Sequence, residues 1–204
     1  MRTLLVATLT LAACSAKDKE DSAAPLPEFY IQATIDGKPF EVSSTSALEG
    51  MRLEAYDSAW NDKNVHAQSV TFGEQRDRMR IEAMALFDGP PDQDETFQVF
   101  YKGAHDYGTM TRNADDDPEE IAGINIIFWD IDERDWWCSV SRGDQSEGSF
   151  QILRHDLYDG NATQDGLRIW GITEGLFSCT LYSAGGSGLL VEDGLFRMLT
   201  ILMD

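Results

Sequence analysis

Apolar and polar residues alternate with a period of two along most of this 204-residue chain, and this pattern constrains the fold more than any other. Phe29–Ile35, Met79–Phe87 and Ile124–Phe128 all carry it, and turns such as Asp36-Gly37 and Asp193-Gly194 separate such runs. Alternation places every second side chain on the same face of a strand. We therefore expect an all-β fold, an antiparallel β-sandwich or barrel of roughly nine to eleven short strands.

Two segments within this pattern matter for the later argument. Phe97, Val99 and Tyr101 continue the alternation, so we expect them to form a strand. Asp117–Ile121, which begins with an aspartate before a proline, is where we expect a helical turn. A parallel sheet would require long helical crossovers between strands, and the pattern offers none.

The first residues have the order of a secretory signal peptide. Arg2 precedes an apolar run from Leu4 to Leu11, and small residues and a cysteine follow. A run of about eight apolar residues is too short for a membrane-spanning helix, which needs roughly twenty. Leu11-Ala12-Ala13-Cys14 resembles the lipobox of bacterial lipoproteins. This resemblance implies cleavage before Cys14, a diacylglycerol on its sulfur and an acyl chain such as palmitate on its amino group.

We therefore expect residues 1–13 to be a signal peptide, residues 14–27 a lipid-anchored flexible tether, and residues 28–204 a single β-rich domain. An aspartate after the lipid cysteine resembles an inner-membrane retention signal, so Ser15 in that place implies the outer membrane. The charged cluster Lys17–Asp21 is similar to stretches in surface-exported lipoproteins of Bacteroidetes-type bacteria, although tethers are also charged simply to stay solvated. Both a periplasm-facing and a cell-surface orientation stay open.

The chain has 16 basic and 36 acidic residues, and its formal net charge is −20. Nucleic acid and anionic lipid would be repelled by such a surface, so neither is an expected partner. Acidic clusters at Asp88–Glu95, Asp115–Asp117 and Asp130–Asp135 suggest calcium, but solvated loops explain them better. We expect no metal site, and no cofactor other than the covalent lipid on Cys14.

Three cysteines are present, and the lipoprotein interpretation assigns Cys14 to lipid. Cys138 and Cys179 then remain as an even pair in an oxidising compartment, which favours a disulfide between them. Both lie in apolar segments typical of strand interiors, so the bridge would join neighbouring strands or two facing sheets. Two buried thiols without a disulfide are the alternative. A zinc site is disfavoured because no Cys-x-x-Cys or His-x-x-x-His spacing accompanies them.

The chain shows no recognisable catalytic signature. His66, His105 and His155 are far apart in the sequence, although His105-Asp106 and His155-Asp156 could meet in space as metal ligands with oriented carboxylates. A Gly-x-Ser-x-Gly nucleophile motif is missing. Among 36 acidic residues, a chance carboxylate pair carries no specificity for glycoside hydrolysis. We predict that the protein is not an enzyme, and the alternative is a hydrolase whose histidines or acids converge in the folded chain.

Tryptophans are concentrated around one expected hairpin. Trp136 and Trp137 are adjacent, so in a strand they point to opposite faces. We expect Trp136 to face the core together with Cys138, and Trp137 to face outward near Trp129. Trp129 and Trp137 are therefore the predicted ligand-binding pair, because exposed tryptophans on a β-sandwich can stack on sugar rings. Core filling is the alternative role for most of these side chains.

Motifs at both ends of the domain resemble uncharacterised β-rich lipoproteins of Bacteroidetes-type bacteria. An aromatic strand pair opens the domain at Tyr30–Phe40, and Gly-x-Phe motifs close it at Gly175–Phe177 and Gly194–Phe196. No catalytic residues come with this resemblance. We predict an outer-membrane-anchored lipoprotein that acts as a binding or structural accessory module, with the membrane and a partner protein or glycan as its partners. Carbohydrate binding through the 129–137 hairpin is a narrower alternative.

Overall fold

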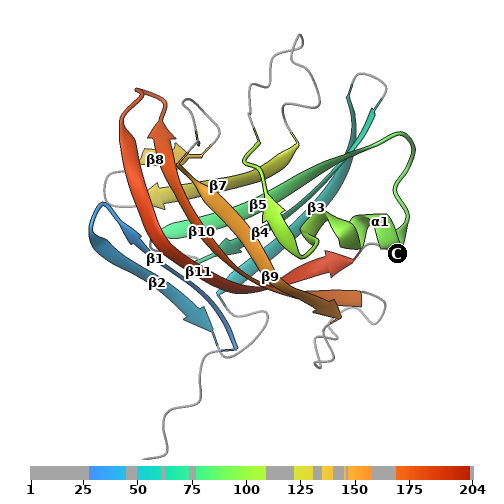
Figure 1. The fold of residues 1–204 in the computed structure, drawn as a ribbon, viewed down its shortest axis with the longest axis horizontal. Helices are drawn as coiled ribbons and strands as arrows, with labels where there is room; N and C mark the ends of the chain where they lie inside the picture. Colours follow the sequence, from blue (N-terminus) through green and yellow to red (C-terminus); the bar gives the residue numbers. More distant parts are fainter. Residues whose placement is uncertain are drawn as a thin grey trace, which may run out of the picture.

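A computed structural model describes residues 28–44, 50–60, 63–73, 77–108, 122–130, 135–139, 145, 147–157 and 169–202. In these ranges the chain forms eleven strands, one five-residue helix and one short 3₁₀ helix (Figure 1). The helical segment comprises α1 (Gln93–Phe97) and the 3₁₀ helix η1 (Gln98–Phe100). The strands are β1 (Phe29–Ile35), β2 (Lys38–Ser44), β3 (Met51–Trp60), β4 (Lys63–Phe72), β5 (Arg78–Phe87), β6 (Gly103–His105), β7 (Gly123–Asp130), β8 (Asp135–Cys138), β9 (Ser149–Leu157), β10 (Ile169–Ser183) and β11 (Gly188–Leu202).

The predicted all-β class is confirmed. The strands form one antiparallel sheet that curls into a half-barrel (Figure 1). Its main path runs β2-β1-β11-β10-β8-β7-β5-β4-β3. β11, which is paired with β1 and β10, also packs against β3 and β4. The curl therefore brings the two halves of the sheet together around a shared interior.

The sheet divides at β10, because two different strands share one of its edges. β9 pairs with the stretch from Gly171 to Ser178, and β8 pairs with Tyr182 and Ser183. β6 extends the β9 branch, and β7 continues from β8. Beyond β6, the backbone of Tyr107 forms a parallel bridge with Ile124 of β7, so the two branches are linked again.

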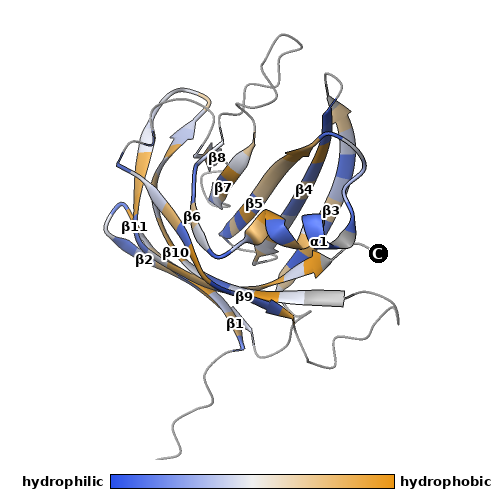
Figure 2. Ribbon diagram, turned by 45° about the vertical axis from the view of Figure 1, so that its right-hand side comes forward, coloured by the Kyte–Doolittle hydropathy of each residue, from blue (hydrophilic) through white to orange (hydrophobic). Residues whose placement is uncertain are grey.

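Alternating side chains fill the concave side of the sheet. Figure 2 shows hydrophobic and hydrophilic residues alternating along β3, β4 and β5. The predicted inward residues of β1, β5 and β7 lie in one hydrophobic cluster, except that Ala85 and Phe87 of β5 are partly buried and pack against it. Its largest fully buried side chains are Phe29, Phe72, Phe100, Phe150, Phe196, Ile31, Met79, Ile81, Ile124, Ile126, Ile152 and Leu181.

The two Gly-x-Phe motifs lie side by side on β10 and β11. Gly175 pairs with Phe196, and Phe177 pairs with Gly194. A Cβ atom at Gly175 would lie 2.5 Å from Cζ of Phe196, and one at Gly194 would lie 2.5 Å from Cδ1 of Phe177. Each glycine therefore makes room for the phenylalanine ring of the opposite strand. This reciprocal contact explains why the same spacing occurs in both strands.

α1 and η1 stand where the alternation of Phe97–Tyr101 predicted a strand, so that prediction is wrong. A capping box starts the helix. The Asp92 carboxylate accepts a hydrogen bond from the Glu95 N–H at 2.9 Å, and Oε2 of Glu95 accepts one from the Asp92 N–H at 3.0 Å. The acidic cluster Asp88–Glu95 is therefore more than a solvated loop, because two of its carboxylates fix the start of α1.

The apolar side chains of this helical segment enter the interior of the half-barrel. Val99 and Phe100 are buried in the core. The ring of Phe97 packs against His155, with ring centroids 4.0 Å apart. Across the described ranges, no helix is both long and apolar enough to cross a membrane.

Candidate functional site

The residues of the predicted lipid anchor lie outside the described part of the chain. These are the signal peptide 1–13, Cys14 and the rest of the tether 14–27. Lipidation of Cys14 therefore stays a prediction. The acidic cluster Asp115–Asp117 and the helical turn expected at Asp117–Ile121 also lie outside the described residues.

The disulfide predicted between Cys138 and Cys179 is absent, and both residues are buried thiols. Cys138 pairs with Tyr182, which lies three positions after Cys179 on β10. Because side chains alternate along a strand, Cys138 shares the outer face with Tyr182, whereas Cys179 points into the core. The two sulfur atoms thus lie on opposite faces of the sheet, a geometry that no disulfide can bridge without backbone movement.

Each thiol has a distinct polar contact. The Cys138 thiol donates a hydrogen bond to Oδ1 of Asn125 at 3.0 Å. Burial raises the pKa of the Cys179 thiol to about 12, and a contact with the Tyr107 hydroxyl opposes this increase. Burial likewise raises the pKa of Tyr107. Cys179 is therefore protonated at neutral pH, which makes it a poor nucleophile and a poor metal ligand.

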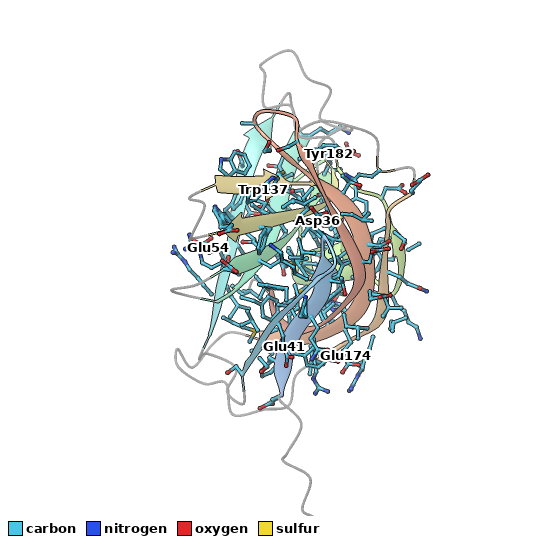
Figure 3. The ribbon with its side chains drawn as sticks, turned by 90° about the vertical axis from the view of Figure 1, so that its left-hand side faces the viewer. Asp36, Glu41, Glu54, Trp137, Glu174 and Tyr182 are labelled. Atoms are coloured by element: carbon cyan, nitrogen blue, oxygen red, sulfur yellow. The ribbon has the colours of Figure 1, made fainter. Side chains whose placement is uncertain are left out.

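The β7–β8 hairpin sorts its tryptophans to opposite faces. Phe128 of the core pairs with Trp137, and their rings lie 6.0 Å apart. Trp137 is only 5% exposed, so its predicted outward orientation is wrong. Trp136 pairs with Trp129 on the other face and is 44% exposed. Figure 3 shows Trp137 on β8, close to Tyr182 near the end of β10.

Three side chains form a row across the outer face of β5, β7 and β8, and we call Arg78, Trp129 and Trp136 the tryptophan row. Arg78 pairs with Trp129 in the register of the sheet, and Trp129 pairs with Trp136. The guanidinium carbon of Arg78 lies 5.2 Å from the ring centroid of Trp129, a cation–π contact. Sequence analysis did not identify Arg78, because the pairing of β5 with β7 leaves no local signal.

Arg78 differs from the arginines beside it on the same face. Nη2 of Arg80 lies 2.6 Å from Oε2 of Glu82, and Nη2 of Arg52 lies 2.6 Å from Oε1 of Glu54. Within the described ranges, Arg78 forms no ion pair with a carboxylate. Its positive charge is therefore held by the Trp129 ring and is not neutralised by a described acid.

A second polar group lies on the inner face, around His66 of β4. Nδ1 of His66 donates to Oδ1 of Asp57 at 2.6 Å, and its Nε2 accepts a hydrogen bond from the Gln68 amide at 3.1 Å. The same amide nitrogen donates to the carbonyl oxygen of Thr96 in α1 at 3.3 Å. His66 is fully buried, so it acts here as the group that orients Gln68 toward α1.

The other two histidines bind carbonyl oxygens farther along the same segment. Nε2 of His155 donates to the Phe97 carbonyl at 2.8 Å, and Nε2 of His105 donates to the Tyr101 carbonyl at 2.7 Å. Nδ1 of His155 and the Thr173 hydroxyl lie 2.8 Å apart. Burial lowers the pKa of both imidazoles. Both rings are therefore mainly neutral at pH 7 and serve as hydrogen-bonding groups.

The described residues contain no group of three or more histidine, cysteine or acidic side chains that could hold a metal ion. His105 and His155 use Nε2 to bind backbone carbonyls.

Comparison with known proteins adds no further constraint. No protein-family model, no curated protein and no solved structure matches this chain. The tryptophan row and the histidine contacts therefore have to be assessed from their own geometry.

Proposed function

We propose that this protein is a bacterial outer-membrane lipoprotein whose β-domain binds carbohydrate through the tryptophan row. The lipobox ending at Cys14 supports the membrane anchor. The exposed ring of Trp136, beside Trp129 and Arg78, supports the binding surface. This proposal narrows the broader expectation of a binding or structural accessory module.

The exposure of Trp136 is the observation that carries the proposal. The side chain is 44% exposed, although the next residue along the strand fills the core. Single exposed apolar residues are common on protein surfaces. Trp136 differs from such residues because it is in register with a second tryptophan and a stacked arginine. The row thus combines an apolar ring with several hydrogen-bond donors.

A sugar chain presents the chemistry that matches this combination. Its C–H groups form an apolar face that packs on an indole ring, and its hydroxyl oxygens accept hydrogen bonds from a guanidinium group. Arg78 already covers the ring of Trp129, so Trp136 is the platform for the sugar and Trp129 holds the arginine in place. Neighbouring strands lie about 4.8 Å apart, so the row extends over roughly 10 Å and fits an oligosaccharide better than one sugar.

Replacement of Trp136 tests the binding surface. Titration of soluble neutral polysaccharides, followed by intrinsic fluorescence and affinity electrophoresis, should identify at least one ligand. Trp136→Ala should then weaken binding at least tenfold, which corresponds to about 1.4 kcal/mol. Trp136→Phe should retain part of the affinity, because it keeps an aromatic platform.

Tyr101→Ala is the matched control, since Tyr101 is similarly exposed, at 47%, and lies outside the row. It should leave the affinity unchanged. The absence of binding to every polysaccharide, or an equal loss in both alanine variants, would count against the proposal.

Replacement of Cys14 tests the anchor separately. Cys14→Ser should move the protein from the membrane fraction to the soluble fraction and abolish metabolic labelling with palmitate. Unchanged fractionation would refute the lipoprotein assignment without bearing on the tryptophan row.

A further inference from the structure

All three histidines of the chain support one short segment, which we call the α1–η1 segment and which runs from Asp92 to Tyr101. Three of its carbonyl oxygens accept hydrogen bonds from side chains outside it. Gln68, which is oriented by His66, donates to the Thr96 carbonyl. His155 donates to the Phe97 carbonyl, and His105 donates to the Tyr101 carbonyl. All three histidines thus hold in place the only helical part of the described structure.

These contacts attach the segment to opposite sides of the interior. Gln68 lies on β4, near one end of the main path of the sheet, whereas His155 lies on β9, in the branch that starts at β10. Between them, Val99 and Phe100 are buried in the core. The α1–η1 segment therefore spans the interior and covers part of the core with its own side chains.

We propose that the α1–η1 segment is a lid on the half-barrel, which opens reversibly in mildly acidic surroundings when His155 and His105 are protonated. Opening would withdraw Val99 and Phe100 from the core and expose the apolar interior. The lid lies on the inner side of the sheet, so the inference does not depend on carbohydrate binding at the tryptophan row.

Proton uptake at His155 disturbs an existing hydrogen bond. In the neutral ring, Nδ1 accepts from the Thr173 hydroxyl, because Nε2 already carries the proton donated to Phe97. A protonated Nδ1 must donate to Thr173 instead, and the Thr173 proton must then turn to another acceptor. The Thr200 hydroxyl, 3.4 Å away, offers only a long contact.

Burial, more than the surrounding charges, decides in which direction the pKa of each histidine shifts. Burial is the main cause that lowers the pKa of both imidazoles, and the charge of His105 lowers the pKa of His155 further. The hydrogen bonds to the Tyr101 and Phe97 carbonyls raise the two pKa values and are the main opposing cause, and Asp106 and Asp156 raise them less. Burial outweighs these effects, so the net shift of both pKa values is downward. Asp57 and His66 face the segment from β3 and β4, and Asp94 and Glu95 on α1 are exposed.

A histidine with a lowered pKa binds its proton more weakly in the closed state than in the open state. The ordinary pKa of both groups is 6.5. The closed lid is therefore fully favoured above pH 6.5, and this preference is lost as the pH falls below that value toward the lowered pKa.

Hydrogen exchange with mass spectrometry on the full-length protein tests the lid. After correction for intrinsic exchange, amides of residues 92–105 should lose protection at least tenfold between pH 7.5 and about pH 5, while β10 and β11 stay protected. Return to pH 7.5 should restore protection. Unchanged protection of residues 92–105, or simultaneous loss in all strands, would overturn the proposal.

The double variant His105→Gln and His155→Gln tests the sensor, because glutamine keeps an N–H donor but does not titrate in this range. Its lid should remain protected at about pH 5. Asp92→Ala is the control, since loss of the capping box should loosen the lid at both pH values without removing the pH response. An unaltered response in the double variant would refute the role of the two histidines.

If the double variant does not fold, NMR titration of the wild-type imidazole signals still decides the question. The two histidines should titrate over the same pH range in which residues 92–105 lose protection. Titration outside that range would exclude them as the trigger.

Discussion

Two adjacent tryptophans on β8 occupy opposite environments. Trp137 packs against Phe128 in the core, whereas Trp136 lies with Trp129 and Arg78 on the outer face. The same residue type thus contributes stability on one face and a proposed binding surface on the other. A shift of one position along a strand reverses these roles. The role of an aromatic residue in such a sheet therefore depends on its register more than on its type.

Alanine substitution at the two tryptophans should separate the faces most clearly. Trp137→Ala should reduce the free energy of unfolding by about 3–5 kcal/mol, because it removes a large side chain from the core and leaves a cavity. Trp136→Ala should change it by no more than about 0.5 kcal/mol. Urea denaturation followed by circular dichroism measures both values. Similar losses for the two variants would contradict the assignment of faces.

A glycine on the inner face sharpens the comparison. Gly175→Ala should cost about 1–3 kcal/mol, because the new methyl group would meet the Gln151 carbonyl and the Phe196 ring. Gly185→Ala is the control, since its nearest neighbour would be Oγ of Ser183 at 3.7 Å. Thermal unfolding of the two variants should show a lower midpoint for Gly175→Ala alone. An unchanged midpoint would disprove the close glycine–phenylalanine contact.

The cysteines provide the smallest test, because it changes no residue of the β-domain and reports only whether the two thiols are free and buried. Cys138 lies on the outer side and Cys179 on the inner side, and both are buried. In the protein without its lipid cysteine, a thiol reagent should label neither residue in the native state and both residues in denaturant. Mass measurement before and after reduction should show no difference. A mass that is lower by two hydrogens before reduction would show that Cys138 and Cys179 form a disulfide after all.

Alternation predicted the inner faces correctly wherever only one phase of a strand is apolar. Phe29–Ile35 and Met79–Ala83 are of this kind, and their expected residues lie in the core. At Trp136-Trp137-Cys138 both phases are apolar, so the pattern cannot distinguish the inner from the outer face. The incorrect orientation of Trp137 and the incorrect disulfide both follow from this ambiguity.

The remaining differences have local and non-local causes. The apolar spacing of Phe97–Tyr101 imitates a strand, yet the capping box at Asp92 and Glu95 was a readable signal for a helix start. By contrast, the contacts of Arg78 and of the three histidines depend on which strands are neighbours in the sheet. That order is fixed by packing over the whole domain, so no short stretch of sequence reports it.

The pairing of β1 with both β2 and β11 affects how the chain reaches its folded state. β1 and β2 can form a hairpin as soon as they are made, but the second edge of β1 stays unsatisfied until the last described strand has been synthesised. Such distant pairing slows folding and leaves a strand edge available for aggregation. We therefore expect the protein to fold slowly and to be prone to aggregation until β11 has paired with β1.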